Sequence, residues 1–392
     1  MAGVGLGQVL AWGCIYYPVS VTGPLISRDL GVSPGAVYGA YCALLIASAS
    51  AAPVVGRAID RYGGRPVLAT GAAVAALGLA SMAASPNFPL YAACSLVVGV
   101  AAAMSLYDAA FPALVEATHP QGRRAITLVT FLGGFASTLS WPVTAALVAW
   151  IGWRDAYLAY AAVMALIGLP LALWSLPRRR SAGPRPPATA SGDEVALPTV
   201  ARRRAFLLFA AAVTANQFVA SGLLIHLIDF FQRVGVTERA AVALAMVFGP
   251  SQVLGRLGEM VAGDRFSAIA TGRVAMVCLP AGLAVLAVSP SSLPVAALFV
   301  AALGVSNGLV TIARGTVTLA LFGPLGYGAR MGRLTAPTVA ARAAGPLAFA
   351  VAIEAFGTVP TLAASFVLAS GAVLAMEAVA RIERRARPAR VC

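Results

Sequence analysis

Long apolar stretches recur along the whole chain, for example at 67–84, 206–225 and 274–288, and none of these three contains a charged residue. A helix needs about 20 apolar residues to cross the hydrocarbon core of a bilayer, whereas a strand needs only about 10. The sequence shows no sustained alternation of apolar and polar residues, which membrane β-barrels require. Charged residues make up only 11% of the chain, against about 25% in soluble domains. The sequence therefore predicts an all-α integral membrane protein.

Pro, Gly, Asn and charged residues divide the chain into twelve predicted membrane spans. The spans cover residues 4–27, 33–57, 66–84, 88–115, 124–150, 154–176, 205–231, 237–262, 270–289, 292–319, 333–354 and 358–380. A long polar stretch separates the sixth span from the seventh, and its arginines and prolines are typical of a linker. The predicted parts are an N-terminal six-helix bundle (1–176), a cytoplasmic linker (177–204), a C-terminal six-helix bundle (205–380) and a basic cytoplasmic tail (381–392).

The distribution of arginine predicts the orientation of the chain in the membrane. All 28 basic residues are arginines, and 22 of them fall on one predicted side, in the linker, in the tail and in or beside the loops after even-numbered spans. This excess indicates that both termini are cytoplasmic. Because the net charge of +14 follows from this pattern, we expect the lipid bilayer and not a nucleic acid as the partner of the basic residues.

The sequence carries no recognisable catalytic or metal-binding motif. The five cysteines are scattered, and their spacing fits neither a metal site nor a disulfide framework. There is no phosphate-binding loop and no nucleophile with a base at a recognisable spacing. We therefore expect no enzyme activity, no bound metal and no cofactor.

The loop between the second and third spans holds the most specific motif, Gly56-Arg57-Ala58-Ile59-Asp60-Arg61-Tyr62-Gly63-Gly64-Arg65. Gly56 would let a neighbouring helix approach closely. Asp60 can cap a helix N-terminus or pair with an arginine, and the Gly63-Gly64 pair permits the positive φ of a tight turn. An echo, Gly255-Arg256-x-x-Glu259, follows 199 residues later near the end of the eighth span. Such repeated halves are typical of secondary transporters.

This loop resembles the signature loop of the major facilitator superfamily, and the matching residues are Gly56, Asp60, Arg61, Tyr62, Gly63 and Arg65. The resemblance implies twelve helices in two six-helix bundles, alternating access, a small-molecule substrate and no prosthetic group. It also implies that spans 1, 4, 7 and 10 line a central cavity. We expect a monomer in the inner membrane of a bacterium. The fifth span departs from the Gly-Pro signature of many drug antiporters in this family, because it offers Gly133-Gly134 and Trp141-Pro142 instead.

Ionisable residues inside the spans are costly and therefore mark candidate functional positions. Asp108 in the fourth span and Arg314 in the tenth are near-equivalents, 206 positions apart. One interpretation is a site in which Arg314 holds an anionic substrate while Asp108 carries a proton or balances the charge, and the other is a permanent salt bridge. Arg342 in the eleventh span has no acid within a turn of its own helix, so it needs a partner elsewhere or a ligand. Two such arginines favour a small carboxylate, which a guanidinium binds through paired hydrogen bonds.

The seventh span adds two polar pairs. His226 and Asp229 share one helix face, which suits proton coupling because histidine titrates in the physiological range. The alternative is a pair of residues at the membrane boundary. Asn216 and Gln217 would hydrogen-bond either a substrate or a neighbouring helix.

The first span carries Gln8, Trp12 and Tyr16 at intervals of four residues. On a helix they share one face, and an aromatic and polar stripe of this kind suits a binding cavity, whereas interfacial aromatic residues are the competing interpretation. Asn307 in the tenth span is a further candidate.

These observations predict a secondary active transporter of a small solute, coupled to protons and favouring a small organic anion. An alternative is an exporter of drugs or metalloids, because Trp12-Gly13-x-x-Tyr16-Tyr17 with Tyr107-Asp108-Ala109-Ala110-Phe111 resembles a bacterial subgroup associated with arsenite efflux. Arsenite is neutral at pH 7, so this alternative would leave the arginines structural. An alternative of another class is a membrane sensor that transports nothing.

Overall fold

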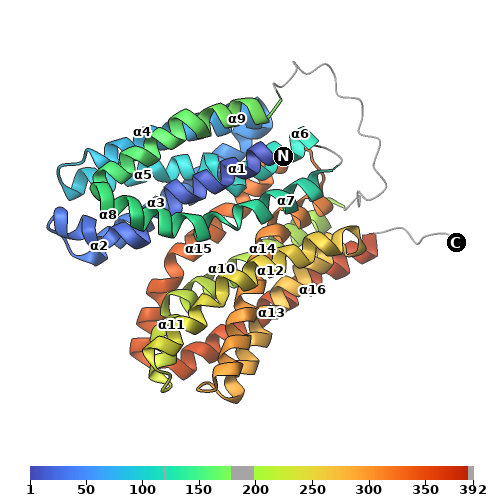
Figure 1. The fold of residues 1–392 in the computed structure, drawn as a ribbon. Coiled ribbons are helices and arrows are strands. Elements are labelled where there is room, and N and C mark those ends of the chain that lie inside the picture. Colours follow the sequence, from blue (N-terminus) through green and yellow to red (C-terminus); the bar gives the residue numbers. More distant parts are fainter. Residues whose placement is uncertain (119–120, 178–197, 387–392) are drawn as a thin grey trace. The chain divides into compact units, whose positions relative to one another are not determined.

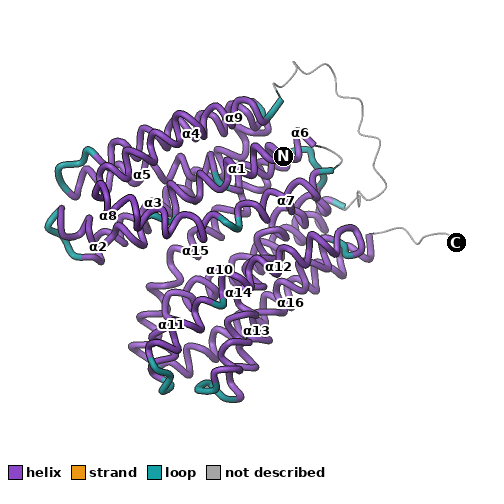
Figure 2. The backbone as a smooth tube through the Cα atoms, viewed as in Figure 1, coloured by secondary structure: helices purple, strands orange, loops and turns teal. Residues whose placement is uncertain are grey.

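The structure is a computed structural model that describes residues 1–118, 121–177 and 198–386 (Figure 1). Within these residues the chain forms helices joined by short turns, and it contains no strand (Figure 2). Most of the predicted linker (178–197) and the end of the predicted tail (387–392) lie outside the described residues.

Eleven helical segments in the described part of the chain are long and apolar enough to cross a membrane. One of them, Gly122–Ser175, has 54 residues, more than twice the ~20 that one crossing needs. Gly152 interrupts this segment with a φ of 77° and a ψ of 170°, so the segment accounts for two spans. The observed helices therefore confirm the predicted all-α membrane fold with twelve spans.

The helices fall into two compact units, Met1–Ala188 with Pro324–Val339 (unit 1) and Thr189–Gly323 with Ala340–Cys392 (unit 2). Unit 1 contains α1 (Ala2–Ala11), α2 (Val19–Asp29), α3 (Pro34–Tyr62), α4 (Gly64–Ala83), α5 (Phe88–Ser105), α6 (Tyr107–Thr118), α7 (Gly122–Gly133), α8 (Ala136–Val163) and α9 (Leu169–Ser175). Unit 2 contains α10 (Thr199–Arg233), α11 (Glu238–Met246), α12 (Phe248–Ala262), α13 (Ala268–Val288), α14 (Leu293–Phe322) and α16 (Thr358–Ala386). The helix α15 (Tyr327–Phe356) is shared, because unit 1 includes its first part, up to Val339, and unit 2 the rest.

Close helix contacts hold unit 1 together. The helix α5 packs against α3 and α4, and α4 also packs against α8 and α9 (Figure 1). A Cβ atom on Gly99 of α5 would overlap the carbonyl oxygen of Leu44 in α3. Small residues allow helices in a membrane to approach in this way, where van der Waals packing drives association. Large apolar side chains such as Leu77 and Leu166 stay exposed, which is typical of a surface that faces lipid.

Unit 2 is built around α13 and α14, which pack against each other along their length. The helix α12 covers α14, and α16 lies against both α10 and α13. Phe231, Leu279 and Phe299 are almost completely buried between these helices. This packing fixes the positions of α10 and α14, which carry six of the predicted site residues.

Several predicted spans of unit 1 are interrupted, and the first and the fourth matter for the site. In the first span a π-helical turn at Trp12–Tyr16 separates α1 from α2. Pro18 has no N–H to continue the helix, and the N–H of Tyr17 donates instead to the carbonyl of Trp12 at 3.2 Å. In the fourth span the extended residue Leu106 (φ −82°, ψ −175°) separates α5 from α6. Discontinuous helices of this kind provide the binding sites of many transporters, and π-helical turns are frequent at functional sites.

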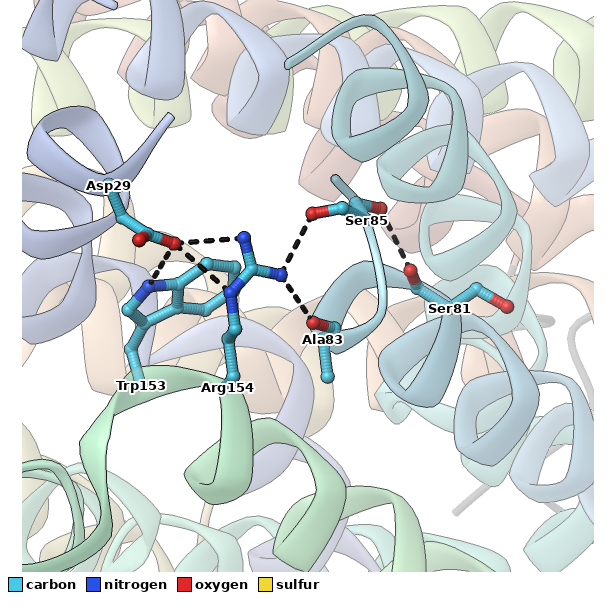
Figure 3. A network of polar contacts seen from close by, with 6 residues as sticks. All are labelled: Asp29, Ser81, Ala83, Ser85, Trp153 and Arg154. Carbon is cyan, nitrogen blue, oxygen red and sulfur yellow. Dashed lines mark hydrogen bonds and ion pairs between the residues drawn. The ribbon is translucent and has the colours of Figure 1, made fainter. Parts of the chain in front are cut away.

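A clasp at one end of unit 1 joins three helices (Figure 3). The guanidinium of Arg154 contacts Oδ2 of Asp29 through Nε at 3.0 Å and Nη2 at 2.8 Å. Its Nη1 donates to the carbonyls of Ala83 at 2.6 Å and Ser85 at 2.8 Å. Trp153 completes the clasp, because its Nε1 donates to Asp29 at 3.1 Å and its ring lies under the guanidinium. Arg154 thus satisfies carbonyls that the end of α4 leaves without helical donors.

Candidate functional site

Gln8 of the first span stabilises the break in the fourth. Because Leu106 is extended, the N–H of Ala109 donates to Leu106 and not to Ser105. Gln8, which is 1% exposed, donates from Nε2 to this carbonyl of Ser105 at 2.8 Å. A carbonyl only accepts, so this contact fixes which end of the Gln8 amide faces Ser105 and leaves its Oε1 on the other side.

Seven aromatic side chains lie next to this junction and form one connected group, the aromatic cluster. Its members are Trp12, Tyr16, Tyr17, Tyr41, Tyr107, Phe111 and Trp141. The ring of Trp12 lies at its centre, 4.8 Å from Tyr16, 6.1 Å from Tyr17 and 5.3 Å from Tyr107, measured between ring centroids. The cluster therefore brings together side chains from the π-helical turn, α3, α6 and α8.

Nε1 of Trp12 and Oε1 of Gln8, beside the cluster, are buried without a hydrogen-bond partner among the described residues, and so is Oγ of Ser105 at the break. Gln8 and Trp12 contact the two sides of the break, Ser105 and Tyr107 respectively. Buried polar groups are normally satisfied, so each such atom calls for an explanation. The predicted stripe of Gln8, Trp12 and Tyr16 thus faces a structured junction of two interrupted helices.

Asp108 lies in the first turn of α6, directly after the break, and is half-buried. Its Oδ1 accepts a hydrogen bond from Oγ1 of Thr335 at 2.7 Å, and Thr335 belongs to the part of α15 in unit 1. Arg314 lies in unit 2, in the uninterrupted helix α14, and is 4% exposed. The two positions therefore differ in local structure, although the sequence made them near-equivalents.

In unit 2 a short chain of hydrogen bonds joins α10, α14 and α13. Nδ2 of Asn216 donates to Oγ of Ser306 at 3.3 Å, and Ser306 donates to the carbonyl of Ala275 at 2.7 Å. Asn216 thus links helices. Its neighbour Gln217 is 7% exposed, and its Oε1 has no hydrogen-bond partner among the described residues. Asn307, beside Ser306, is half-buried.

His226 and Asp229 have different partners in the structure. Nε2 of His226 lies 2.9 Å from the carbonyl oxygen of Pro346 in α15, and the imidazole borders a small apolar pocket of unit 2. Asp229 is about half-exposed and forms an ion pair with Arg233, one turn along α10, at 2.7 Å. Arg342 is half-buried in the part of α15 that belongs to unit 2.

The motif loop packs tightly against the first turns of α15. Both carboxylate oxygens of Asp60 accept backbone N–H groups, from Gly328 at 2.9 Å and from Ala329 at 2.8 Å. A Cβ atom on Gly56 would overlap the carbonyl oxygen of Gly328. Of the two interpretations of Asp60, the structure shows the helix cap.

The turn itself depends on Gly63, which has a φ of 91°. Gly64 already begins α4, and its N–H donates to Oε2 of Glu116 at 3.0 Å. Arg61 lies over the ring of Tyr62, 5.2 Å from its centroid. Arg65 is half-buried in the first turn of α4.

The echo of the motif, from Gly255 to Glu259, lies in α12 of unit 2 and packs against α14. Gly255 lies in α12, and a Cβ atom there would stand 3.2 Å from the backbone of Val305 in α14. Arg256 and Glu259 are 4% and 7% exposed. The helix α12 is capped by Gly263 with a φ of 52°, as α3 is capped by Gly63, so the two helices end alike.

Sequence reasoning missed several residues of the junction. Tyr41, Tyr107 and Trp141 come from helices other than the first span, so no spacing within one span relates them to Trp12. Tyr17 joins Trp12 only because the turn is π-helical, which brings positions five apart onto one face. Thr335 carries no charge and gave no signal in the sequence.

Comparisons with known proteins agree with this architecture. The sequence matches the profile described as Major Facilitator Superfamily over residues 4–324, whereas no curated protein matches it. The human organic anion transporter MFSD10 (TETRAN) has a similar structure, with a TM-score of 0.71, 17% identity, and 96% of this chain and 98% of that chain covered.

Two sugar transporters also have similar structures. The proton:xylose symporter XylE has a TM-score of 0.72 at 14% identity, with 96% of this chain and 94% of that chain covered. The fucose:proton symporter FucP of E. coli has a TM-score of 0.70 at 15% identity, with 99% and 98% covered. Identities this low show a shared fold. The profile match, which spans most of the residues, shows that the chain belongs to the Major Facilitator Superfamily.

Proposed function

We propose that this protein is a proton-coupled secondary transporter of a small organic anion. It acts by alternating access as a monomer in a bacterial inner membrane, with both termini in the cytoplasm. The family membership supports transport of a solute. The orientation rests on the arginine distribution, and the charge of the substrate rests on residues of unit 2.

The observation that carries the anion is the burial of Arg314. It is the only charged residue of the 30-residue helix α14 and is 4% exposed. A cation within an apolar span is expensive, and such residues usually serve a substrate, an ion path or a partner. Arg342, half-buried in α15, adds a second guanidinium at membrane depth. Two guanidinium groups favour carboxylates, which they bind through paired hydrogen bonds.

Asp108 is the group proposed to carry the proton. It is half-buried in the first turn of a discontinuous span, where acidic residues commonly form part of ion and proton paths. The transporter relatives include two that are described as proton symporters and one described as an organic anion transporter. These descriptions support the proposal by analogy of fold.

The test is uptake of a panel of radiolabelled carboxylates by proteoliposomes with an inward proton gradient. Uptake of one carboxylate is expected in the wild type, and Arg314→Ala should abolish it. Arg314→Lys keeps the charge but loses the paired N–H donors with which a guanidinium binds a carboxylate. It should therefore weaken uptake by a smaller factor. Arg233→Ala is the matched control, because Arg233 lies in the same unit, about half-exposed, in an ion pair within one helix.

Two outcomes would replace the proposal. Loss of arsenite tolerance on deletion of the gene, with no carboxylate uptake, would point to metalloid efflux. Absence of any flux, with ligand binding retained, would point to a sensor.

A further inference from the structure

We propose that Gln8 and Trp12 bind an uncharged hydroxyl group of the transported solute at the junction of the two interrupted helices in unit 1. This inference deepens the proposed transport function and rests on it, but it does not depend on the charge of the substrate. It concerns a group of the solute other than the anionic group that the arginines of unit 2 are proposed to bind.

The two unpartnered atoms have opposite hydrogen-bonding character. Nε1 of Trp12 is only a donor and Oε1 of Gln8 is only an acceptor, and both are buried without a hydrogen-bond partner among the described residues. They come from positions four apart, so they lie on one side of the first span. A group that satisfies both must accept one hydrogen bond and donate another.

This requirement separates the classes of ligand. A carboxylate only accepts, so it would leave Oε1 of Gln8 unsatisfied. A quaternary ammonium forms no hydrogen bond, and a primary ammonium only donates, so each would leave Nε1 of Trp12 unsatisfied. A hydroxyl accepts and donates at once. An unsatisfied buried polar group costs more than an ordinary hydrogen bond contributes, which gives a site built in this way its selectivity.

The aromatic cluster argues against a cation cage. Tyr16 meets both Trp12 and Tyr41 edge to face, at interplanar angles of 64° and 72°. Tyr17 likewise meets Trp141 at 77°. Rings arranged in this way cover one another's faces with edges, whereas a cage for a quaternary ammonium presents several open faces to one point. The cluster instead holds Trp12 in place, so that its Nε1 keeps a fixed direction.

Gln8 is held equally firmly. Its Nε2 is used by the carbonyl of Ser105, so the amide cannot rotate to offer a donor without leaving that carbonyl unsatisfied. The break at Leu106 therefore determines that Gln8 offers an acceptor to a ligand. Its Nε2 faces the carbonyl of Ser105, so the amide oxygen is the atom that remains available.

Two sources could supply the hydroxyl, a hydroxylated carbon skeleton such as a sugar, or a neutral oxyacid such as arsenous acid. Purified protein would be titrated with five probes while its melting temperature is recorded. The probes are glucuronate (anionic and hydroxylated), glucose (neutral and hydroxylated), cyclohexanecarboxylate (anionic without hydroxyls), arsenite and tetramethylammonium (a cation without hydroxyls). Binding of at least one hydroxyl-bearing probe is expected, with glucuronate at least about tenfold tighter than cyclohexanecarboxylate if the ligand is a ring, which is what a lost pair of hydrogen bonds would give.

Trp12→Phe tests the same point in the protein, because phenylalanine keeps a ring in the cluster and removes the donor. It should weaken the hydroxyl-bearing probe about 5- to 10-fold. Trp141→Phe is the matched control, since Trp141 belongs to the same cluster, is 49% exposed and touches Tyr17 at its edge. That variant should bind like the wild type. The probe series in the wild type decides the matter even if Trp12→Phe does not fold.

Three results would overturn the inference. Equal binding of glucuronate and cyclohexanecarboxylate, or binding of tetramethylammonium in their place, would show that the site does not recognise a hydroxyl group. The first of these results would still leave a carboxylate transporter intact. Equal effects of the two tryptophan variants would show that a water molecule alone fills the site. No binding of any hydroxyl-bearing probe would also reject it. Binding of glucose or arsenite without any carboxylate would instead reject the anion proposal and keep the hydroxyl site.

Discussion

The carboxylate of Asp60 caps a helix that begins 267 positions later, with its Oδ1 2.9 Å from the backbone nitrogen of Gly328. The second oxygen accepts from the next N–H, that of Ala329. The first N–H groups of a helix lack partners inside the helix, and a negative charge there is favoured by the helix dipole. Unit 1 thus fastens the start of α15, while the end of the same helix belongs to unit 2.

Replacement of Asp60 should therefore lower stability in a graded way. Asp60→Ala removes both acceptors and should cost about 1–2 kcal/mol, the usual range for a helix cap with charge. Asp60→Asn keeps one acceptor oxygen without the charge and should cost less. Thermal unfolding of the purified protein in detergent would measure both, with Asp229→Ala, an exposed acid in a one-turn ion pair, as the control. Equal melting temperatures for Asp60→Ala and the control would mean that the cap contributes nothing.

The close contact of Gly56 with Gly328 predicts a second difference. Gly56→Ala places a methyl group on the carbonyl of Gly328, and a backbone cannot move aside as a flexible side chain can. We expect loss of folded protein, measured as the monodisperse peak in size-exclusion chromatography. Gly39→Ala lies on the same helix, where a Cβ atom would have nothing within 4 Å. It should be neutral or slightly stabilising, because alanine is the better helix former. Normal yield of Gly56→Ala would contradict the observed packing.

The sequence was sufficient for the features that depend on local chemistry. The lengths of the apolar runs predicted the spans, because bilayer thickness sets them. The turn at Gly63 was also predictable from local chemistry, since only glycine adopts a positive φ there without strain. Pro18 also indicates an interruption in the first span, because proline has no backbone N–H to donate within the helix.

The features that depend on distant partners could not be predicted. Leu106 has neither proline nor glycine beside it, and the break there is stabilised by Gln8, which donates to the carbonyl of Ser105, 97 positions along the chain. The choice between a helix cap and an arginine pair for Asp60 depended on α15, and Asp108 accepts a hydrogen bond from Thr335, a residue without charge. In each case the deciding contact comes from a helix far along the chain.

The clasp at Arg154 predicts that lysine is a poor substitute for arginine at this position. A lysine keeps the charge but cannot reach Asp29 and the carbonyls of Ala83 and Ser85 at once. The ion pair itself is partly exposed and contributes little, so most of the loss should come from the two carbonyls left without a donor. Arg154→Lys should therefore cost nearly as much as Arg154→Ala, roughly 1–3 kcal/mol. Thermal unfolding is the measurement, and Arg233→Lys, which has only its one-turn ion pair to lose, is the control. Full stability of Arg154→Lys would show that charge alone matters.

Asp108 predicts how transport depends on the proton gradient. Asparagine has nearly the shape of aspartate, and its side-chain oxygen can still accept the hydrogen bond from Thr335, so Asp108→Asn should fold normally. It cannot bind and release a proton, so the energy of the gradient would no longer reach the solute. In proteoliposomes the variant should lose accumulation against a concentration gradient but retain exchange of labelled for unlabelled solute. Uptake by the wild type should rise when an inward proton gradient is imposed, and the variant should show no such rise. Asp229→Asn should behave like the wild type in both assays. Accumulation by Asp108→Asn at the wild-type level would assign the proton to another residue, with His226 the next to examine.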